Sequence, residues 1–376
     1  MTRYAEILPP GEFLKDELEA RSWSQVEFAE IIGRPARLVN EIIAGKRAIT
    51  PETAVQLSDS LGTSAELWLN LESQYQLSKV TRTDNLIQRK AKLYERFPVR
   101  ELIRRGWIEG PTKLEQLEQK IMDFFCIESI DEKPVLAHAA RKTSYADEVS
   151  ILQYAWLCRV KQIAESHVAR KYDRSALIKS FTRLRNLLGA PEEARNVAKI
   201  LGECGVRFVL VEALPRSKID GACLWLENSQ PVVALSARLD RIDNFWFVLR
   251  HELEHLIQEH GKESGLMLDE DLSESASEAE EAVANKAASE FAVEEGELTN
   301  YMARVNPYFF SEDRVLGFAG RIGVHPGIVI GRLQKRLEQT DYPNPYKFLR
   351  AYLVKIRHIA AQTTPTDGWG QIYPLK

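Results

Sequence analysis

The stretch SQVEFAEIIGRPARLVNEIIAGKR, residues 24–47, decides the fold of the amino-terminal part of the chain. Ser24 precedes an amphipathic run and can cap a helix, because its hydroxyl accepts a hydrogen bond from a free amide of the first turn. Gly33 can end that helix and Gly45 the next one, since glycine adopts the left-handed conformation at low cost. The sequence therefore predicts two short helices joined by a tight turn at Arg34-Pro35.

The apolar and charged positions of this stretch predict which side of each helix is buried. We expect the inward positions to be Val26, Phe28, Ala29, Ile32, Leu38, Ile42 and Ile43. The outward positions of the second helix are Arg37, Asn40 and Glu41. In a helix-turn-helix such outward side chains enter the major groove of DNA. Arg34, Lys46 and Arg47 extend positive charge along the same edge and are further candidate DNA contacts, although a helical hairpin with solvated charges has the same spacing.

A longer stretch around these helices, from Pro9 to Leu77, resembles the XRE-type helix-turn-helix of HigA-like antitoxins. The shared features are Pro10-Gly11, Ser24-Gln25, Phe28-Ala29, Asn40-Glu41-Ile42, Gly45-Lys46-Arg47, Ile49-Thr50-Pro51 and Leu67-Trp68-Leu69-Asn70. The resemblance implies a homodimer that binds double-stranded operator DNA. It also implies that Gln25 touches phosphate and that Arg37 and Asn40 face base edges. Lys46 and Arg47 would then touch the DNA backbone.

The composition places limits on the class of protein. The chain has 376 residues, 44% of them hydrophobic and 28% charged, which is typical of a globular protein. Its net charge of −4 argues against a generally basic nucleic-acid binder, and residues 1–80 carry 12 acidic and 8 basic side chains, so DNA contacts must come from local patches. The first twenty residues lack the apolar centre and small-residue cleavage site of a signal peptide, no apolar run approaches the ~18 residues that span a membrane, and there is no Cys-x-x-Cys pair. We expect a cytoplasmic protein without a membrane partner.

The chain is long enough for several domains. We predict a mostly α fold with a small β-sheet, of class α+β. The expected parts are a helix-turn-helix domain at 1–80, a helical connecting region at 81–190, a third domain at 191–360 and an irregular tail at 361–376. The third domain contains a His-Glu-x-x-His motif at 251–255, which is typical of zincin-like folds. Three short apolar runs are expected to form an antiparallel meander: VRFVLVEAL (206–214), GACLWLE (221–227) and PVVALS (231–236). The last of these is expected to be an edge strand that aligns a substrate.

A second motif lies in RHELEHLIQEH, residues 250–260. His251 and His255 are four residues apart on an apolar helix, so their rings lie on one face and both can bind one zinc ion. Glu252 stands where the general base of a zinc peptidase is found. His-Glu-x-x-His also occurs by chance on charged surface helices. His260 is expected to cap the end of the helix.

Two histidines leave a tetrahedral zinc site without its third protein ligand. The following helix offers Glu278, Glu280 and Glu281 as candidates, each of which is otherwise a solvated charge. Glu281 has Ala284 and Ala288 on its own face, and small residues there would allow two helices to approach closely.

Residues 195–335 resemble the ImmA/IrrE family of zinc-dependent metallopeptidases. The resemblance is carried by IDGACLWLENSQPVVALSARLDRIDNFWFVLRHELEHLIQEH and by EEAVANKAASEFAV. It implies Zn²⁺ as the cofactor and Glu281 as the third ligand, from a pattern like Glu-x-x-Ala-Asn-x-x-Ala. Glu254 departs from the family, in which a small residue usually precedes the second histidine. His325 is considered as a group that supports the zinc ligands or the transition state.

Two functions fit these features. The first is a DNA-binding regulator or antitoxin whose zinc peptidase acts on a partner protein, such as a toxin or a repressor. The second is a regulator or antitoxin without catalysis, in which the peptidase fold serves only to bind the toxin. A test of cleavage separates these two functions better than metal content does, because a bound zinc ion can be structural.

Overall fold

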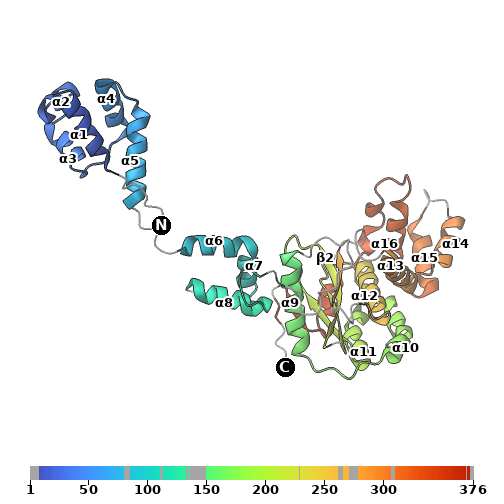
Figure 1. Cartoon of the computed structure of the whole chain (residues 1–376). Helices are drawn as coiled ribbons and strands as arrows, with labels where there is room; N and C mark the ends of the chain where they lie inside the picture. The colour runs from blue at the N-terminus through green and yellow to red at the C-terminus, as the bar shows by residue number, and fades with distance from the viewer. Residues whose placement is uncertain are drawn as a thin grey trace. The chain divides into compact units, whose positions relative to one another are not determined.

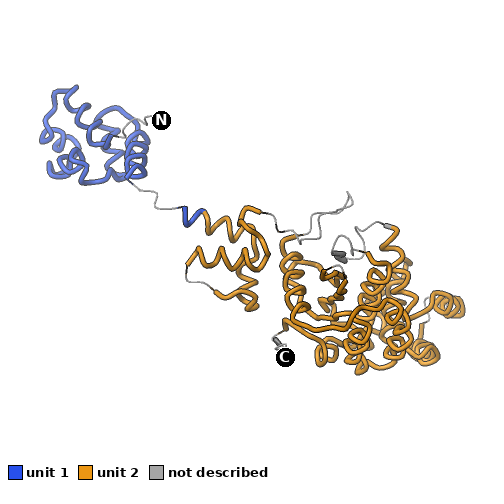
Figure 2. The backbone as a smooth tube through the Cα atoms, turned by 60° about the horizontal axis from the view of Figure 1, so that its bottom comes forward, with its two compact units in different colours: residues 1–88 blue, residues 89–376 orange. Residues whose placement is uncertain are grey.

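The computed structural model describes residues 8–79, 85–110, 113–132, 134, 150–227, 229–260, 266–270, 278–305, 310–369 and 371–372. The chain divides into two compact units, residues 1–88 and residues 89–376, coloured separately in Figure 2. Most residues of regular structure are helical, and the strands form one small sheet (Figure 1). The predicted fold class is therefore confirmed. In the part of the chain that is described, no helix is long and apolar enough to cross a membrane.

Unit 1 is all helical. Its helices are α1 (Pro10–Ala20), α2 (Gln25–Ile31), α3 (Ala36–Ile43), α4 (Pro51–Leu61) and α5 (Ala65–Lys79). They enclose one apolar core, whose buried members include Leu14, Phe28, Val39, Leu57 and Trp68. This core fixes α2 and α3 relative to each other and leaves the outer side of α3 to solvent.

The sequence signals at the ends of α2 and α3 are present as predicted. The Ser24 hydroxyl accepts from the Glu27 amide, and the Glu27 carboxylate accepts from the Ser24 amide, which makes a reciprocal cap. Gly33 and Gly45 both have φ of +64° just beyond the two helices. Such values cost glycine little, so each helix ends there.

The predicted inward face needs two corrections. Val26 is 58% exposed, because it lies two residues before the buried Phe28 and therefore points to the opposite side of α2. In α3 the deepest apolar residue is Val39 at 0% exposure, with Ile42 beside it, whereas Leu38 and Ile43 are only half-buried. Val39 lies one turn before Ile43 and three residues before Ile42, so a helical face centred on Val39 was also available in the sequence.

Gly11 permits the close crossing of α1 over the end of α3. A Cβ atom on Gly11 would lie 2.3 Å from the Ile42 carbonyl oxygen and 2.6 Å from that of Ile43. Backbone oxygens cannot move aside as a side chain can. We therefore expect Gly11→Ala to destabilise unit 1 by about 1–3 kcal/mol, the usual range for overpacking. Hydrogen exchange of the α1 and α3 amides in the full chain measures this change.

The matched control is Gly317→Ala in α15 (Glu312–Ile322), where an added Cβ meets open space. Alanine favours a helix interior over glycine by about 1 kcal/mol, so this variant should be as stable as wild type or more stable. A Gly11→Ala protein with undiminished protection of α1 would show that the crossing has room for a side chain.

Among the described residues, unit 2 contains the other helices and the strands. Its first helices are α6 (Leu86–Arg96), which begins just before the unit boundary, then α7 (Val99–Arg104), α8 (Leu114–Phe125), α9 (Ile151–Glu165), α10 (Arg174–Arg185) and α11 (Val197–Glu203). Its later helices are α12 (Ile242–Ile257), α13 (Glu278–Ala292), α14 (Glu295–Arg304), α15, α16 (Pro326–Leu337) and α17 (Arg357–Ala360). Short 3-10 helices are η1 (Asn186–Gly189), η2 (Pro191–Asn196), η3 (Pro345–Lys347) and η4 (Arg350–Tyr352).

The sheet of unit 2 is mixed. Its strands are β1 (Arg207–Val211), β2 (Ile219–Leu226), β3 (Gln230–Leu235), β4 (Leu266–Glu270), β5 (Thr366–Gly368) and β6 (Gln371–Ile372), in the order β4-β2-β3-β1-β5-β6. β2 and β3 form an antiparallel hairpin, but β1 runs parallel to β3. The predicted antiparallel meander is therefore wrong. β1 is a continuous apolar run, a pattern typical of strands that are covered on both faces and often paired in parallel.

The prediction that residues 231–236 form an edge strand is also wrong. β3 pairs with β2 on one side and with β1 on the other, so its backbone has no free edge for a substrate. The strand at that end of the sheet is β4, which pairs with β2 alone among the described strands.

Helices cover both faces of the sheet, as α9 and α12 do on opposite sides of β2 in Figure 1. Alternate residues of one strand enter different cores: Phe208 and Leu210 of β1 join the α12 side, while Val209 and Val211 join the α9 side. The Trp156 indole of α9 donates to the Val211 carbonyl over 2.8 Å and fixes α9 to the sheet. The apolar side chains of α6–α8 belong to the α9 side.

The tail predicted to be irregular instead contributes to the sheet. β5 pairs in parallel with β1, and β6 pairs with β5. The Asp367 carboxylate is 2% exposed and forms an ion pair with Arg159 of α9. The Trp369 amide donates to the Glu212 carboxylate over 2.8 Å. These long-range contacts stabilise a Gly/Pro-rich segment that has no strand pattern of its own.

Candidate functional site

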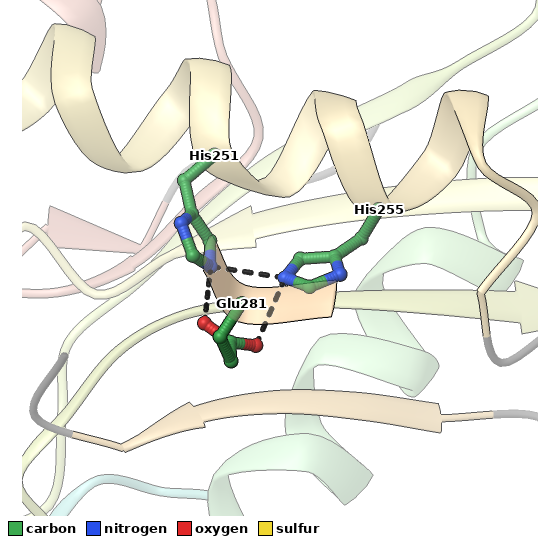
Figure 3. A group of neighbouring side chains, drawn as sticks. All are labelled: His251, His255 and Glu281. Atoms are coloured by element: carbon green, nitrogen blue, oxygen red, sulfur yellow. Dashed lines mark hydrogen bonds and ion pairs between the residues drawn. The ribbon is translucent and has the colours of Figure 1, made fainter. Parts of the chain in front are cut away.

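The three side chains predicted to bind zinc converge in unit 2. His251 and His255 lie on one face of α12, and Glu281 points toward both from α13 (Figure 3). The two Nε2 atoms are 2.9 Å apart. The Glu281 oxygens lie 3.3 Å from His251 Nε2 and 3.2 Å from His255 Nε2. In the part of the chain that is described, these residues form one group whose ligand atoms lie within 4.8 Å of one another.

The spacing of these atoms fits a tetrahedral metal ion. Zinc binds histidine nitrogen and carboxylate oxygen at about 2.0–2.1 Å, so two ligand atoms on a tetrahedral ion are about 3.3–3.4 Å apart. The two distances from Glu281, 3.3 and 3.2 Å, lie close to that value, and the 2.9 Å between the two Nε2 atoms is shorter. Both histidines are almost fully buried, which limits the ways in which their rings can turn. The donor set, two imidazoles and one carboxylate, is one that zinc uses in peptidases.

The environment of Glu281 favours the charged carboxylate that a metal requires. Its burial raises the pKa, but hydrogen bonds from His251 and His255 outweigh that effect and lower the pKa to about 2. On the same helix Ala284 and Ala288 are 0% and 2% exposed. α13 packs directly against α12. Small side chains at this contact therefore bring the Glu281 carboxylate within reach of the histidines.

Glu252 follows His251 on α12, and its side chain packs against strand β2 of the sheet. Its side chain is 1% exposed. A Cβ atom on Gly221 of β2 would lie 2.6 Å from Glu252 Oε1, so the carboxylate occupies space that any other residue in place of Gly221 would fill. Gly221 is not among the candidate site residues that the sequence analysis identifies. A glycine inside a strand is a signal for close approach of another group.

Glu254, the residue that departs from the peptidase family, has a structural environment of its own. It is 8% exposed and accepts hydrogen bonds of 2.7 Å from both Arg250 and Gln258. Its burial raises the pKa, and these two hydrogen bonds outweigh that effect, so the pKa is lowered overall. The Arg250 guanidinium in turn lies over the Phe181 ring at 4.3 Å. The extra carboxylate is therefore accommodated on α12 outside the group formed by His251, His255 and Glu281.

The remaining predicted site residues of unit 2 lie elsewhere or in other roles. His325 caps α16, because its Nδ1 accepts from the Gly327 amide over 3.1 Å, and burial lowers its pKa. It is not part of the group formed by His251, His255 and Glu281. Glu280 faces His260, with 3.7 Å between Oε1 and Nε2. The side chain of Glu278 lies outside the described residues.

The candidate DNA contacts of unit 1 lie along the exposed side of α3 and its ends. The Arg37 side chain is 88% exposed, and its Nε is 2.7 Å from Glu41 Oε1. Arg47 lies 3.3 Å from the other Glu41 oxygen. These hydrogen bonds, that of Arg37 first, lower the pKa of Glu41. Glu41 thus holds two guanidinium groups on the outer side of α3 while leaving most of each in solvent.

The other candidates of this face are accessible too. Asn40 and Lys46 are exposed, and Gln25 is half-buried at the start of α2. Arg34 is exposed in the turn and donates to the Gln56 side chain over 3.0 Å. The six residues predicted for DNA binding therefore all reach the surface of one small unit.

Comparisons with known proteins concern this amino-terminal part. The helix-turn-helix family matches residues 14–68, which run from within α1 into α5. An uncharacterized HTH-type transcriptional regulator, YddM of Escherichia coli K12, is 32% identical over 74 residues, which are 20% of this chain and 79% of that protein. Virulence-associated protein A of Dichelobacter nodosus is 40% identical over 73 residues, 19% of this chain and 72% of that protein.

Through these residues the chain belongs to the helix-turn-helix family.

Among solved structures, the antitoxin HigA of Pseudomonas aeruginosa with the higBA promoter is 35% identical, covers 19% of this chain and 80% of its own, and gives a TM-score of 0.19. The helix-turn-helix match ends before the unit boundary at residue 88. The group formed by His251, His255 and Glu281 lies outside it, so its assignment depends on the geometry and on the motif itself.

Proposed function

We propose that this protein is a DNA-binding regulator whose second unit is a zinc-dependent peptidase acting on a partner protein. The observation that carries the proposal is the convergence of His251, His255 and Glu281 in the same chain as a helix-turn-helix domain. The likeness of residues 195–335 to the ImmA/IrrE peptidases supports it. The HigA-like features of residues 9–77 extend it to an antitoxin that acts as a homodimer, with a toxin or a repressor as the partner.

The residues of the second unit would divide the chemistry between them. His251, His255 and Glu281 would hold zinc through Nε2, Nε2 and a carboxylate oxygen. When bound, the ion supplies Lewis-acid polarisation and makes a water molecule more acidic. The Glu252 carboxylate would take the proton of the attacking water and deliver it to the leaving amine. The buried walls around Glu252, Val248 and Gly221 among them, would keep bulk water away from that carboxylate.

Readout of DNA sequence is expected to depend on Arg37 and Asn40. A bidentate contact to a base edge contributes about 1–3 kcal/mol of discrimination, whereas phosphate contacts carry no sequence information. The double variant Arg37→Ala with Asn40→Ala should therefore lose at least about tenfold of its preference for the promoter of its own gene over scrambled DNA. Fluorescence anisotropy with both duplexes, at several salt concentrations, measures that ratio.

Two controls accompany this measurement. Lys46→Ala with Arg47→Ala should weaken binding to both duplexes alike and reduce the salt dependence, because each lost phosphate contact removes about one released counterion. Arg100→Ala, at an exposed position in the connecting region 81–190, should change neither quantity. If the Arg37 and Asn40 double variant keeps the full preference for the promoter, α3 is not the recognition helix.

A further inference from the structure

His260 is in direct contact with the group of three ligands although it is not one of them. It lies just beyond α12, and its Nδ1 is 3.0 Å from Nδ1 of His255, on the opposite side of that ring from Glu281. Its own Nε2 is 3.7 Å from Glu280 Oε1. The two side chains that sequence reasoning treated as a helix cap and as a competing ligand are thus placed next to each other behind His255.

The backbone holds His260 in this place. Its amide donates to the His255 carbonyl over 2.9 Å, and its own carbonyl accepts from the Trp225 indole of β2 over 3.1 Å. The preceding residue, Glu259, has φ of +57°, a conformation that residues other than glycine rarely adopt. This left-handed turn directs the chain back, so that the His260 ring comes to lie beside His255 instead of continuing away from α12.

The hydrogen positions follow from this arrangement if His255 binds a metal through Nε2. A neutral imidazole carries its hydrogen on one nitrogen only, so Nδ1 of His255 must be the donor. The atom at hydrogen-bond distance is Nδ1 of His260, which must then accept and carry its own hydrogen on Nε2. That hydrogen faces the Glu280 carboxylate. Both hydrogens therefore point in the same direction: that of His255 toward His260, and that of His260 toward Glu280.

We propose that His260 is a positioning residue for the metal site, which accepts the Nδ1 hydrogen of His255, and that Glu280 keeps His260 in the accepting tautomer. The inference rests on the proposed function, because it requires a metal at Nε2 of His255. Partners of this kind fix the ring orientation of a ligand and raise its basicity, and their loss usually weakens metal binding by about 10–100-fold.

The test measures zinc affinity of the full chain by competition with a chelating dye. His260→Ala should raise the Kd for zinc by about 10–100-fold. His260→Asn should recover most of this loss, because its amide oxygen lies near the place of Nδ1 and can accept. His260→Gln should not, because its oxygen lies near the place of Nε2. Glu280→Ala should produce a smaller rise than His260→Ala, and His358→Ala, an exposed histidine, none.

Two further readouts separate positioning from folding. The visible absorption of the Co²⁺-loaded protein should change in His260→Ala and be close to that of wild type in His260→Asn. The metal-free forms of these two variants should have similar Tm values. Equal zinc affinity in wild type and His260→Ala overturns the inference alone. Equal losses in His260→Ala and His260→Asn, with a matching fall in metal-free Tm, assign His260 a structural role and overturn it too. A wild-type chain that binds no zinc would refute both the inference and the proposed function.

Discussion

Glu252→Gln should reduce cleavage of the partner protein by about 10²–10⁴-fold, the usual contribution of a general base. The amide has nearly the same shape as the carboxylate, so it fits the space above Gly221, but it cannot take a proton from water at neutral pH. Glu252 is not one of the three ligands, and zinc content should remain close to that of wild type. Mass spectrometry of a candidate partner, such as the product of an adjacent gene co-expressed with the full chain, measures the cleavage.

Glu254→Gln is the matched control on the same helix. Glu254 is also buried, but it faces Arg250 and Gln258 and has no part in the proposed chemistry. Its replacement should lower thermal stability slightly and leave cleavage intact. If the wild type does not cleave the partner, and Glu252→Gln leaves toxin neutralisation unaffected, the function without catalysis is favoured, in which the peptidase fold serves only to bind the toxin. Loss of zinc or of folding in Glu252→Gln would make Glu252 a structural residue.

The parts of the fold that follow from local chemistry could be predicted from the sequence. The Ser24 cap and the endings at Gly33 and Gly45 depend on a few neighbouring residues. The spacing of His251 and His255 is likewise a property of one helix, because residues four apart always share a face. These features can be predicted without knowledge of any long-range partner.

Strand order could not be predicted in this way. The parallel pairing of β1 with β3 and with β5 joins residues far apart in the chain, and the apolar runs look alike whichever neighbour they take. The Arg159–Asp367 ion pair, which connects α9 to the tail, spans more than 200 residues. A pattern confined to ten residues contains no information about such partners.

The choice of Glu281 as the third candidate ligand depends on both local and long-range information. Glu280 and Glu281 are adjacent in α13, so their sequence surroundings differ little. Their side chains nevertheless point about 100° apart around the helix. In the structure one faces the two histidines and the other faces His260. The buried pair Ala284 and Ala288 marks the side of α13 that meets α12, and this was the signal available in the sequence. The role of His260 required the fold of the turn at Glu259 as well.

Glu281→Gln should have the largest effect on metal binding. The carboxylate contacts both histidine nitrogens, and its pKa of about 2 keeps it charged over the whole physiological range. Its amide substitute has no charge and is a poor zinc ligand, so the Kd for zinc should rise by more than the ~100-fold expected for an outer partner. At zinc concentrations about 100 times the wild-type Kd, the variant should also lose most of the roughly 2.7 kcal/mol of stabilisation that binding gives wild type.

Chelator competition and the zinc-dependent shift in Tm measure these two effects independently. Glu290→Gln, an exposed carboxylate further along α13, should change neither of them, because its side chain is remote from the histidines in the helix. Glu278→Gln and Glu280→Gln distinguish the competing ligands. If either of them abolishes zinc binding while Glu281→Gln retains it, the third ligand has been assigned to the wrong residue, and the approach of α13 to α12 at Ala284 would then serve packing alone.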